Sequence, residues 1–284
     1  MLIGNAPCSW GVFYPTGNTI TADGYLDAIS RAGYEATELG PLGFLPTEPA
    51  QLEDALSRRN LTLTGGAHVH TLAAPGTWPE LKIALDSIGL ILSTLDAPHL
   101  VLMDESEWYP RDKPGAVDKA GWNSMIAYVR DARKHVRDNY GVELTFHPHV
   151  GTCVELESQI DRLLDETEVN ICFDTGHHAF WNQDPVAYMR RTWDRIGYMH
   201  LKNVNPDVCA RVLAGELGPN ESFAAGVMSP LTEGAVDIAA VISFLDEKGY
   251  SGPCVIEQDP SEGGDDPEFL AAKNLVYLKK LIAE

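Results

Sequence analysis

Short apolar runs alternate with amphipathic helical patterns along the whole chain, and this alternation restricts the fold more than any other feature. The 284 residues contain eight strand candidates, and a helix candidate follows each of them. Strands that alternate with helices form parallel sheets, and eight such units in roughly 250 residues are typical of a closed (β/α)8 barrel. We therefore predict an α/β protein in which residues 1–284 form a single TIM-barrel domain.

The apolar runs and their flanking turn residues predict the bounds of the elements. The expected strands are Leu2–Pro7, Ala36–Leu39, Leu61–Thr64, His99–Met103, Val142–Phe146, Val169–Phe173, Ile196–Leu201 and Cys254–Ile256. The expected helices are Ala22–Ala32, Pro49–Arg59, Trp78–Leu95, Pro114–Asn139, Glu155–Leu164, Pro185–Trp193, Val236–Lys248 and Pro267–Ile282. Residues 203–234 match neither pattern, so we expect a long irregular loop there, and loops of this length are often functional lids.

The net charge of the chain restricts the kinds of binding partner that we expect. Acidic residues number 41 and basic residues 21, which gives a formal charge of −20. Such a surface repels phosphate backbones and anionic lipids, so we expect neither a nucleic acid nor a membrane as partner. The first residues lack the pattern of a signal peptide, and the five cysteines are widely spaced without a CxxC pair. This use of cysteine favours a reducing compartment, and we predict a cytoplasmic protein.

Histidines and carboxylates gather at one end of the expected strands. Seven of the nine histidines fall at or just after a strand's carboxyl end: His68, His70, His147, His149, His177, His178 and His200. The carboxylates at the same ends are Glu38, Asp104, Glu105, Asp174, Glu257 and Asp259. In a parallel barrel these ends converge on one mouth, where active sites are found. The alternative interpretation is that they are ordinary solvated loop residues.

Four of these residues have the pattern of a metal site. His147, Asp174, His200 and Glu257 each come at the end of an apolar strand, so rigid backbone would hold each side chain. Two imidazoles and two carboxylates form a mixed nitrogen and oxygen set that suits Mn²⁺, Co²⁺, Fe²⁺, Zn²⁺ or Mg²⁺. The alternative for each residue is a buried hydrogen bond at the barrel mouth.

Short segments of the chain resemble the xylose-isomerase-like sugar isomerase/epimerase superfamily. They are APCSWG near the start, HPHVGT at 147–152, DTGHH at 174–178, HLKN at 200–203 and IEQD at 256–259. Within that superfamily, HPHVGT looks most like the inosose dehydratase branch. The resemblance implies a divalent-metal barrel that acts on small polyols and ketoses, with manganese or cobalt favoured. The family's usual ligands are Glu, Asp, His and Glu on strands five to eight, which correspond here to His147, Asp174, His200 and Glu257.

The chain departs from the family pattern at two positions. His147 stands where the family has a glutamate, which removes a carboxylate that serves isomerases and epimerases as ligand and as acid or base. Asn203 stands where the family's HxKD motif has an aspartate. The first departure weakens an epimerase interpretation and suits a different arrangement for proton transfer.

The remaining polar and aromatic residues have individual roles in this hypothesis, each with packing or solvation as the alternative. The expected base is Glu257, with Glu155 second, and the expected acid is His149, His70 or His177. The residues expected to contact substrate are Trp10, Glu38, His68, His70, His177 and Lys202, with Trp10 and Trp181 as an apolar wall under a ring and Lys202 on an oxyanion.

These residues favour a metal-dependent hydro-lyase that dehydrates a cyclic, inosose-like keto-polyol through an enediolate. A metal that chelates the ketone would acidify the neighbouring C–H, and no GxGxxG motif points to a redox nucleotide. The alternatives are a ketose 3-epimerase or aldose–ketose isomerase, a nucleic-acid enzyme, which the charge disfavours, and a non-catalytic polyol-binding subunit. The partner is a small polyol or ketose, and the sequence is compatible with a homo-oligomer.

Overall fold

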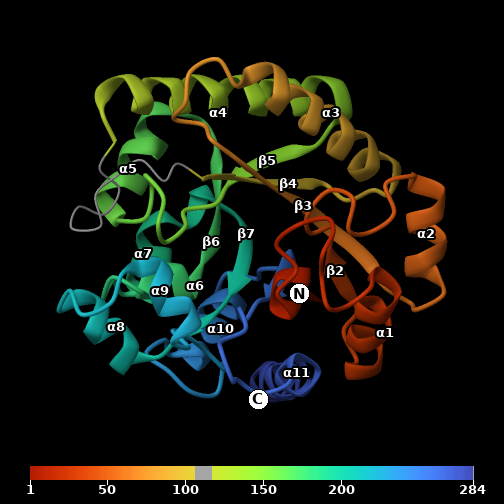
Figure 1. The fold of residues 1–284 in the computed structure, drawn as a ribbon, viewed down its shortest axis with the longest axis vertical. Coiled ribbons are helices and arrows are strands. Elements are labelled where there is room, and N and C mark those ends of the chain that lie inside the picture. The colour runs from red at the N-terminus through yellow and green to blue at the C-terminus, as the bar shows by residue number, and fades with distance from the viewer. Residues whose placement is uncertain (106–116, 284) are drawn as a thin grey trace.

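A closed barrel of eight parallel strands forms the centre of the protein in a computed structural model, which describes residues 1–105 and 117–283. The strands are β1 (Leu2–Asn5), β2 (Ala36–Glu38), β3 (Thr62–His70), β4 (His99–Asp104), β5 (Glu143–Phe146), β6 (Asn170–Asp174), β7 (Ile196–Leu201) and β10 (Pro253–Ile256). Each strand pairs with the next barrel strand along the chain, and β10 closes the barrel against β1. The helices surround this barrel (Figure 1). The TIM-barrel prediction is confirmed.

The outer helices lie close to their predicted positions. They are α1 (Ala22–Ala32), α2 (Pro49–Ser57), α3 (Trp78–Thr94), α4 (Lys119–Tyr140), α5 (Glu157–Glu166), α7 (Pro185–Thr192), α10 (Ile238–Glu247) and α11 (Pro267–Ala283). The Asp118 side chain accepts a hydrogen bond from the Gly121 amide and caps α4, which therefore begins later than the predicted Pro114. The start of that predicted helix, residues 114–116, lies outside the described residues.

Strand β3 is longer than the sequence predicted, because it continues through two glycines that we took for its end. Its residues from Gly65 to His70 pair in register with β4. A Cβ atom on Gly65 would lie 2.6 Å from the His99 carbonyl oxygen, so the close approach of the two strands requires glycine there. The extension places His68 inside the strand and His70 at its last position.

The prediction of an irregular loop over residues 203–234 is wrong. This stretch contains β8 (Asn203–Val204), α8 (Pro206–Leu213), α9 (Pro219–Ala224) and β9 (Met228–Ser229). The strands β8 and β9 pair with each other in antiparallel fashion, so the segment leaves the barrel and returns to it. Each helix begins with a proline at its first position, after Asn205 and Gly218, a helix-start signal that we had overlooked. We call residues 203–229 the β7–α10 insertion.

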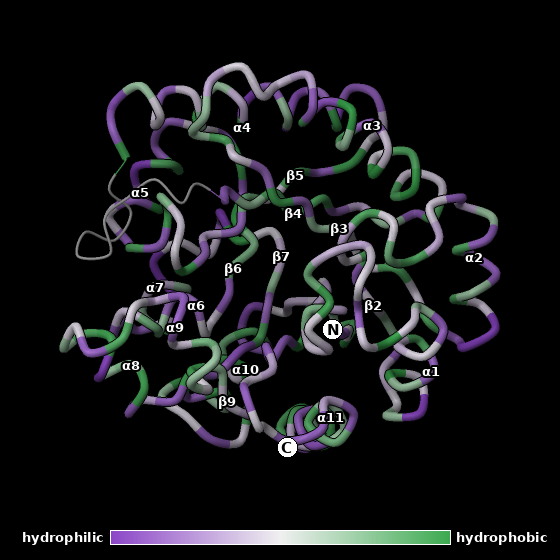
Figure 2. Tube along the Cα trace, in the orientation of Figure 1, coloured by the Kyte–Doolittle hydropathy of each residue, from purple (hydrophilic) through white to green (hydrophobic). Residues whose placement is uncertain are grey.

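Two apolar layers stabilise the barrel. A small cluster fills the barrel interior and consists of Ala6, Val101, Cys172, Tyr198 and Val255. A much larger cluster lies between the strands and the helices. Hydrophilic and hydrophobic residues alternate along the outer helices in Figure 2, as expected for helices with one buried face. None of the helices within residues 1–105 and 117–283 has the length and apolar character needed to cross a bilayer.

Candidate active site at the barrel mouth

Strand register brings the four predicted metal ligands to one mouth of the barrel. Asp174 ends β6 and pairs with His200 of β7. Val255 of β10 pairs with His200, and Glu257 follows two residues later with its amide bonded to the Leu201 carbonyl. His147 follows β5 directly and is buried, as are the other three ligand candidates. The structure thus assembles side chains from four consecutive barrel strands.

His200 lies at the centre of this group, and its two ring nitrogens have different neighbours. Nε2 donates to Glu38 Oε1 at 2.7 Å, and both side chains are only 2% exposed. Nδ1 lies 3.5 Å from Glu257 Oε2 and 3.8 Å from Asp174 Oδ2. Neither Nδ1 nor Asp174 Oδ2 has a hydrogen-bond partner among the described residues. A buried imidazole whose free nitrogen faces two carboxylates is the arrangement of a metal ligand held by a carboxylate.

His147 has the same kind of orientation. Its Nδ1 donates to the Cys172 carbonyl at 3.4 Å, which leaves the lone pair on Nε2. The His147 and His200 ring centroids are 4.9 Å apart. Burial, together with the neighbouring His200 and His149, lowers the pKa of His147 well below its usual value, so the ring is neutral and able to bind a cation. His147 is therefore a neutral ring with an open Nε2. Burial acts to lower the pKa of His200, but Cys172, Glu257 and Glu38 raise it well above its usual value, so Nδ1 of His200 must release a proton when a metal binds.

The mouth carries more buried negative charge than its own cations balance. Among the described residues, four buried carboxylates, of Glu38, Asp174, Glu257 and Asp259, face two buried cations, the Lys202 ammonium and the His200 imidazole, whose pKa is raised well above its usual value. Burial raises the pKa of Asp174 to about 6, even though Lys202 and His200 act to lower it. Burying carboxylates without balancing charge is costly, and a divalent cation would remove most of the imbalance. The donor set and the unpaired ligand atoms therefore fit a divalent metal.

Lys202 links the carboxylates to the histidines. Its Nζ lies 2.9 Å from Glu257 Oε2 and 2.9 Å from Asp259 Oδ2. It also lies 3.1 Å from His177 Nε2, and because an ammonium only donates, the His177 proton must reside on Nδ1. The pKa of His177 is lowered well below its usual value by burial and by the neighbouring His149 and Lys202. His177 is thus a neutral ring at the pH of the cell.

His149 completes the group of rings and is partly open to solvent. Its Nδ1 donates to the Val150 carbonyl at 2.7 Å, so its Nε2 carries a free lone pair. The His149 ring centroid lies 3.8 Å from that of His177 and 5.5 Å from that of His147. Burial, with the nearby Lys202, lowers the pKa of His149 to about 4. The ring can accept a proton but does not hold one at neutral pH.

Comparison with known proteins identifies the family of this barrel. Residues 26–281 match the model of the xylose isomerase-like TIM barrel family. The chain belongs to this family. The family resemblance that the motifs carried is therefore confirmed.

Relatives and a solved structure extend this finding. The chain is 32% identical over 247 residues to the rhizopine catabolism protein MocC of Rhizobium meliloti, which covers 84% of this chain and 75% of MocC. It is 27% identical over 293 residues to the inosose dehydratase of Geobacillus kaustophilus, which covers 99% of this chain and 94% of that protein. The crystal structure of the IOLI protein with a bound zinc atom superposes with a TM-score of 0.76 at 13% identity, over 100% of this chain and 98% of that one. That likeness shows the common barrel.

Glu38 and Glu155 make hydrogen bonds that the sequence did not predict, and their predicted roles stay predictions. Glu38 was expected to contact substrate, but its carboxylate accepts from His200 Nε2 and so orients a ligand candidate. Glu155 Oε2 accepts from the Gly151 amide at 3.0 Å and from Trp181 Nε1 at 2.7 Å. These bonds give Glu155 a positioning role in the loop that carries His149, and a part in proton transfer stays a prediction.

His68 and His70 lie away from the cluster. They stack on each other with centroids 5.8 Å apart, and His70 Nε2 donates to the Thr77 carbonyl. Their strand neighbour Ala67 packs against the interior cluster of the barrel, and side chains alternate along a strand. The two histidines therefore point to the helix side, and the expectation that they line the substrate pocket is not supported. The cause is the unpredicted length of β3.

The expected aromatic wall is also in a different place. Trp10 is 9% exposed and packs edge-on against Tyr25, at 5.0 Å between centroids. Trp181 packs against Phe180 and donates its indole N–H to Glu155. Among the described residues, the non-histidine aromatic side chain near His149 and His177 is Phe223 of α9, 6.4 Å from the His149 ring and 6.3 Å from the His177 ring. The sequence signal was available, since Phe223 is the single aromatic residue within 203–234.

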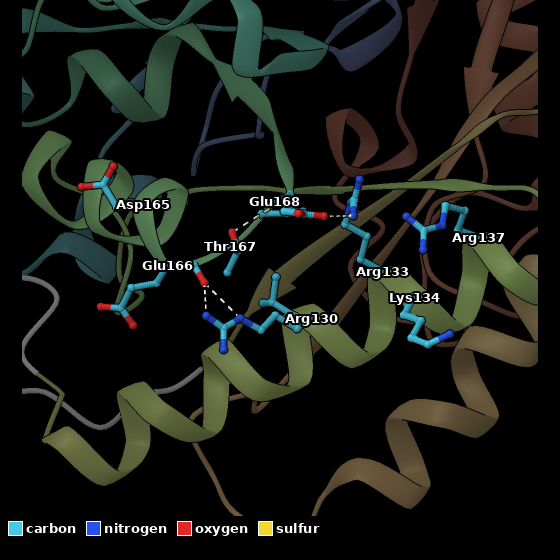
Figure 3. A pocket seen from close by; sticks show the side chains of 10 residues that line it. Arg130, Arg133, Lys134, Arg137, Asp165, Glu166, Thr167 and Glu168 are labelled. Carbon is cyan, nitrogen blue, oxygen red and sulfur yellow. Dashed lines mark hydrogen bonds and ion pairs between the residues drawn. The ribbon is translucent and has the colours of Figure 1, made fainter.

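A separate hollow lies at the other end of the barrel, where β6 begins (Figure 3). It has a volume of about 450 Å³ between α4 and the segment that joins α5 to β6. Arg130 donates to the Glu166 carbonyl, and Arg133 pairs with Glu168 at 3.2 Å. Because these charges bond across the hollow and lie at the end opposite Asp174, we do not assign the hollow to the candidate active site.

Proposed function

We propose that this protein is a divalent-metal-dependent hydro-lyase that removes water from a cyclic keto-polyol such as inosose. The observation that carries the proposal is the pair of oriented imidazoles at the mouth. His147 donates through Nδ1 to a backbone carbonyl and His200 donates through Nε2 to Glu38, so each presents its other nitrogen. Similarity to inosose dehydratases over nearly the whole chain supports the choice of substrate.

The residues that would hold the metal are His147, Asp174, His200 and Glu257. When bound, a divalent ion would supply a Lewis acid that polarises the ketone and acidifies the neighbouring C–H. Because an imidazole replaces one carboxylate of the usual set, the ligands neutralise less of the ion's charge and leave a stronger Lewis acid. We expect Mn²⁺ or Co²⁺, which suit mixed nitrogen and oxygen ligands.

Proton transfer falls to His149 in this proposal. Its Nε2 has a free lone pair at the partly exposed mouth, whereas Glu257 is engaged by Lys202. Nε2 takes the proton from the carbon next to the ketone, the bond from the adjacent carbon to its hydroxyl breaks, and Nε2 returns the proton to the departing oxygen. Water leaves and His149 is neutral again, so the step balances.

Lys202 stabilises the negative charge that develops on oxygen. Burial acts to lower its pKa, yet Asp259, Glu257 and Asp174 raise it well above its usual value, so Lys202 keeps its protons. It therefore acts through its positive charge rather than as an acid. Asp259 and His177 hold its ammonium in place from two sides.

Mass spectrometry tests this function directly. The manganese-loaded protein is incubated with a panel of inososes and ketohexoses, and the products are weighed. We expect loss of one water from an inosose, a new near-ultraviolet absorbance, and loss of both signals on chelation. Conversion without a change of mass would instead favour the ketose 3-epimerase or isomerase alternative. Full activity after complete removal of metal would contradict the proposal.

The cellular setting stays a prediction. All five cysteines are free thiols, which is in keeping with a reducing compartment, and we infer a cytoplasmic enzyme. A homo-oligomer likewise stays a prediction, to be tested by light scattering.

A further inference from the structure

The β7–α10 insertion holds Phe223 firmly over the histidines. The strands β8 and β9 anchor both ends of the insertion, with Asn203 opposite Ser229. Within it, the Val227 amide bonds to the Ser222 carbonyl at 3.0 Å and fixes the end of α9. The Glu262 amide bonds to the Ala224 carbonyl at 3.2 Å, which ties α9 to the loop after β10. These bonds fix the position of α9, and with it the position of Phe223 near His149 and His177.

Phe223 contributes an apolar face beside the charged and polar groups of the mouth. Its ring is parallel to the His149 ring within 1° and is half-buried. The side chain has no polar atom, so its contribution to binding a ligand is apolar contact. The two tryptophans that might have supplied such a face are occupied, Trp10 against Tyr25 and Trp181 on Glu155.

The chemistry of a cyclic polyol matches this arrangement. Its hydroxyls point outward around the rim of the ring, and its axial C–H bonds form an apolar face. The face of an aromatic ring carries partial negative charge and attracts the partly positive hydrogens of such C–H bonds. Open-chain polyols have no fixed C–H face, so an aromatic ring discriminates against them.

We propose that Phe223 is a specificity-determining residue that packs against the C–H face of a cyclic keto-polyol bound beside His149 and His177. This inference rests on the proposed function and adds the residue that recognises the ring of the substrate. The polar histidines and Lys202 contact the hydroxyls and the ketone, while Phe223 selects the ring.

Two substitutions and a matched control test the role of Phe223. Phe223→Ala removes the ring and Phe223→Leu keeps apolar volume without a flat face. The control is Leu213→Ala, which alters a side chain of α8 in the same insertion that is 53% exposed. Each metal-loaded variant is checked for folding by its melting temperature. Kinetic constants are measured with inosose, and calorimetry gives dissociation constants for myo-inositol and for the open-chain hexitol sorbitol.

We expect Phe223→Ala to raise the KM for inosose and the dissociation constant of myo-inositol about tenfold, with kcat changed less than about threefold, since a lost apolar contact weakens binding of ground and transition states alike. Phe223→Leu should show a smaller rise, and neither variant should alter binding of sorbitol. Leu213→Ala should match the wild type. Equal weakening of myo-inositol and sorbitol, or no weakening at all, would overturn the inference.

The binding arm separates this inference from the proposed reaction. If the wild type binds myo-inositol but does not dehydrate inosose, the reaction is wrong, and the dissociation constants still decide the role of Phe223. If the wild type binds neither ring compound, the assignment of Phe223 is overturned as well.

Discussion

The carboxylate of Glu38 should control metal affinity through His200, although it is not one of the four ligands that the sequence predicts. It accepts from His200 Nε2 at 2.7 Å in a site where both side chains are 2% exposed. Glu38→Gln keeps an oxygen that can accept this hydrogen bond but removes the negative charge. Glu38→Ala removes both. The two substitutions therefore separate orientation of the imidazole from its basicity.

The strength of the hydrogen bond between His200 and Glu38 sets the expected loss of metal affinity. A hydrogen bond to a charged group contributes about 1.5–3 kcal/mol, and a neutral one about 0.5–1.5 kcal/mol. Loss of the charge in Glu38→Gln should thus reduce the free energy of metal binding by about 1–1.5 kcal/mol, which corresponds to about tenfold weaker binding of the metal. Loss of the whole contact in Glu38→Ala should weaken the metal up to about a hundredfold, in line with other partners of ligating histidines.

Competition with a metal-sensitive fluorescent chelator measures these affinities for Mn²⁺ and Co²⁺. Asp104→Asn is the matched control, because Asp104 is also a fully buried carboxylate at the end of a barrel strand. Its Oδ1 accepts from the Leu72 amide at 2.9 Å, so it orders a loop rather than His200. We expect Asp104→Asn to leave metal affinity within about threefold of the wild type, since its carboxylate accepts from the Leu72 and Ala73 amides and the Cys153 thiol.

Two results would refute this reasoning. Unchanged affinity in Glu38→Ala would show that His200 needs no partner on Nε2. Equal losses in Glu38→Ala and Asp104→Asn would show that the effect is general destabilisation of the mouth.

Three further predictions follow from the same structure. His147→Ala should abolish metal binding and turnover, whereas His147→Glu should keep the metal and shift the products from dehydration toward isomerisation, as mass spectrometry would reveal; an active His147→Ala enzyme would show that His147 is no ligand. Burial, followed by the influence of His70, lowers the pKa of His68 to about 4 in the folded protein. Below pH 6.5 the unfolded chain therefore protonates this imidazole while the folded protein does not. The contribution of His68 to stability should therefore fall between pH 6.5 and 4 by up to roughly 3 kcal/mol. Other buried histidines such as His149 add to the total fall, so urea unfolding of His68→Gln should show a smaller fall than the wild type but not a flat profile. Removal of metal should lower the melting temperature, since an ion at a hundred times its Kd stabilises by about 2.7 kcal/mol; calorimetry with and without chelator decides, and an unchanged melting temperature would count against a bound metal.

Some features of the site were predictable because they depend on local sequence alone. A residue directly after an apolar strand must lie at the strand's carboxyl end, and in a parallel barrel those ends share one mouth. The placement of His147, Asp174, His200 and Glu257 follows from this rule without knowledge of any distance.

Other features escaped prediction because local patterns were ambiguous. Two adjacent glycines normally end a strand, yet Gly65 and Gly66 continue β3 because β4 approaches too closely for a side chain at Gly65. That one difference determined which face His68 and His70 occupy, since side chains alternate along a strand.

The sequence by itself determined the barrel, through its alternating apolar patterns, and the set of polar residues at the barrel mouth. Only the tertiary structure decided which of those residues meet. Glu38 bonds to His200 across 162 positions of the chain, and Lys202 reaches Asp259 across 57. Phe223 comes beside His149 because an insertion folds back over the mouth. The physical reason is that barrel closure and strand register set contacts between distant segments, and no local pattern encodes the distance between two strand ends.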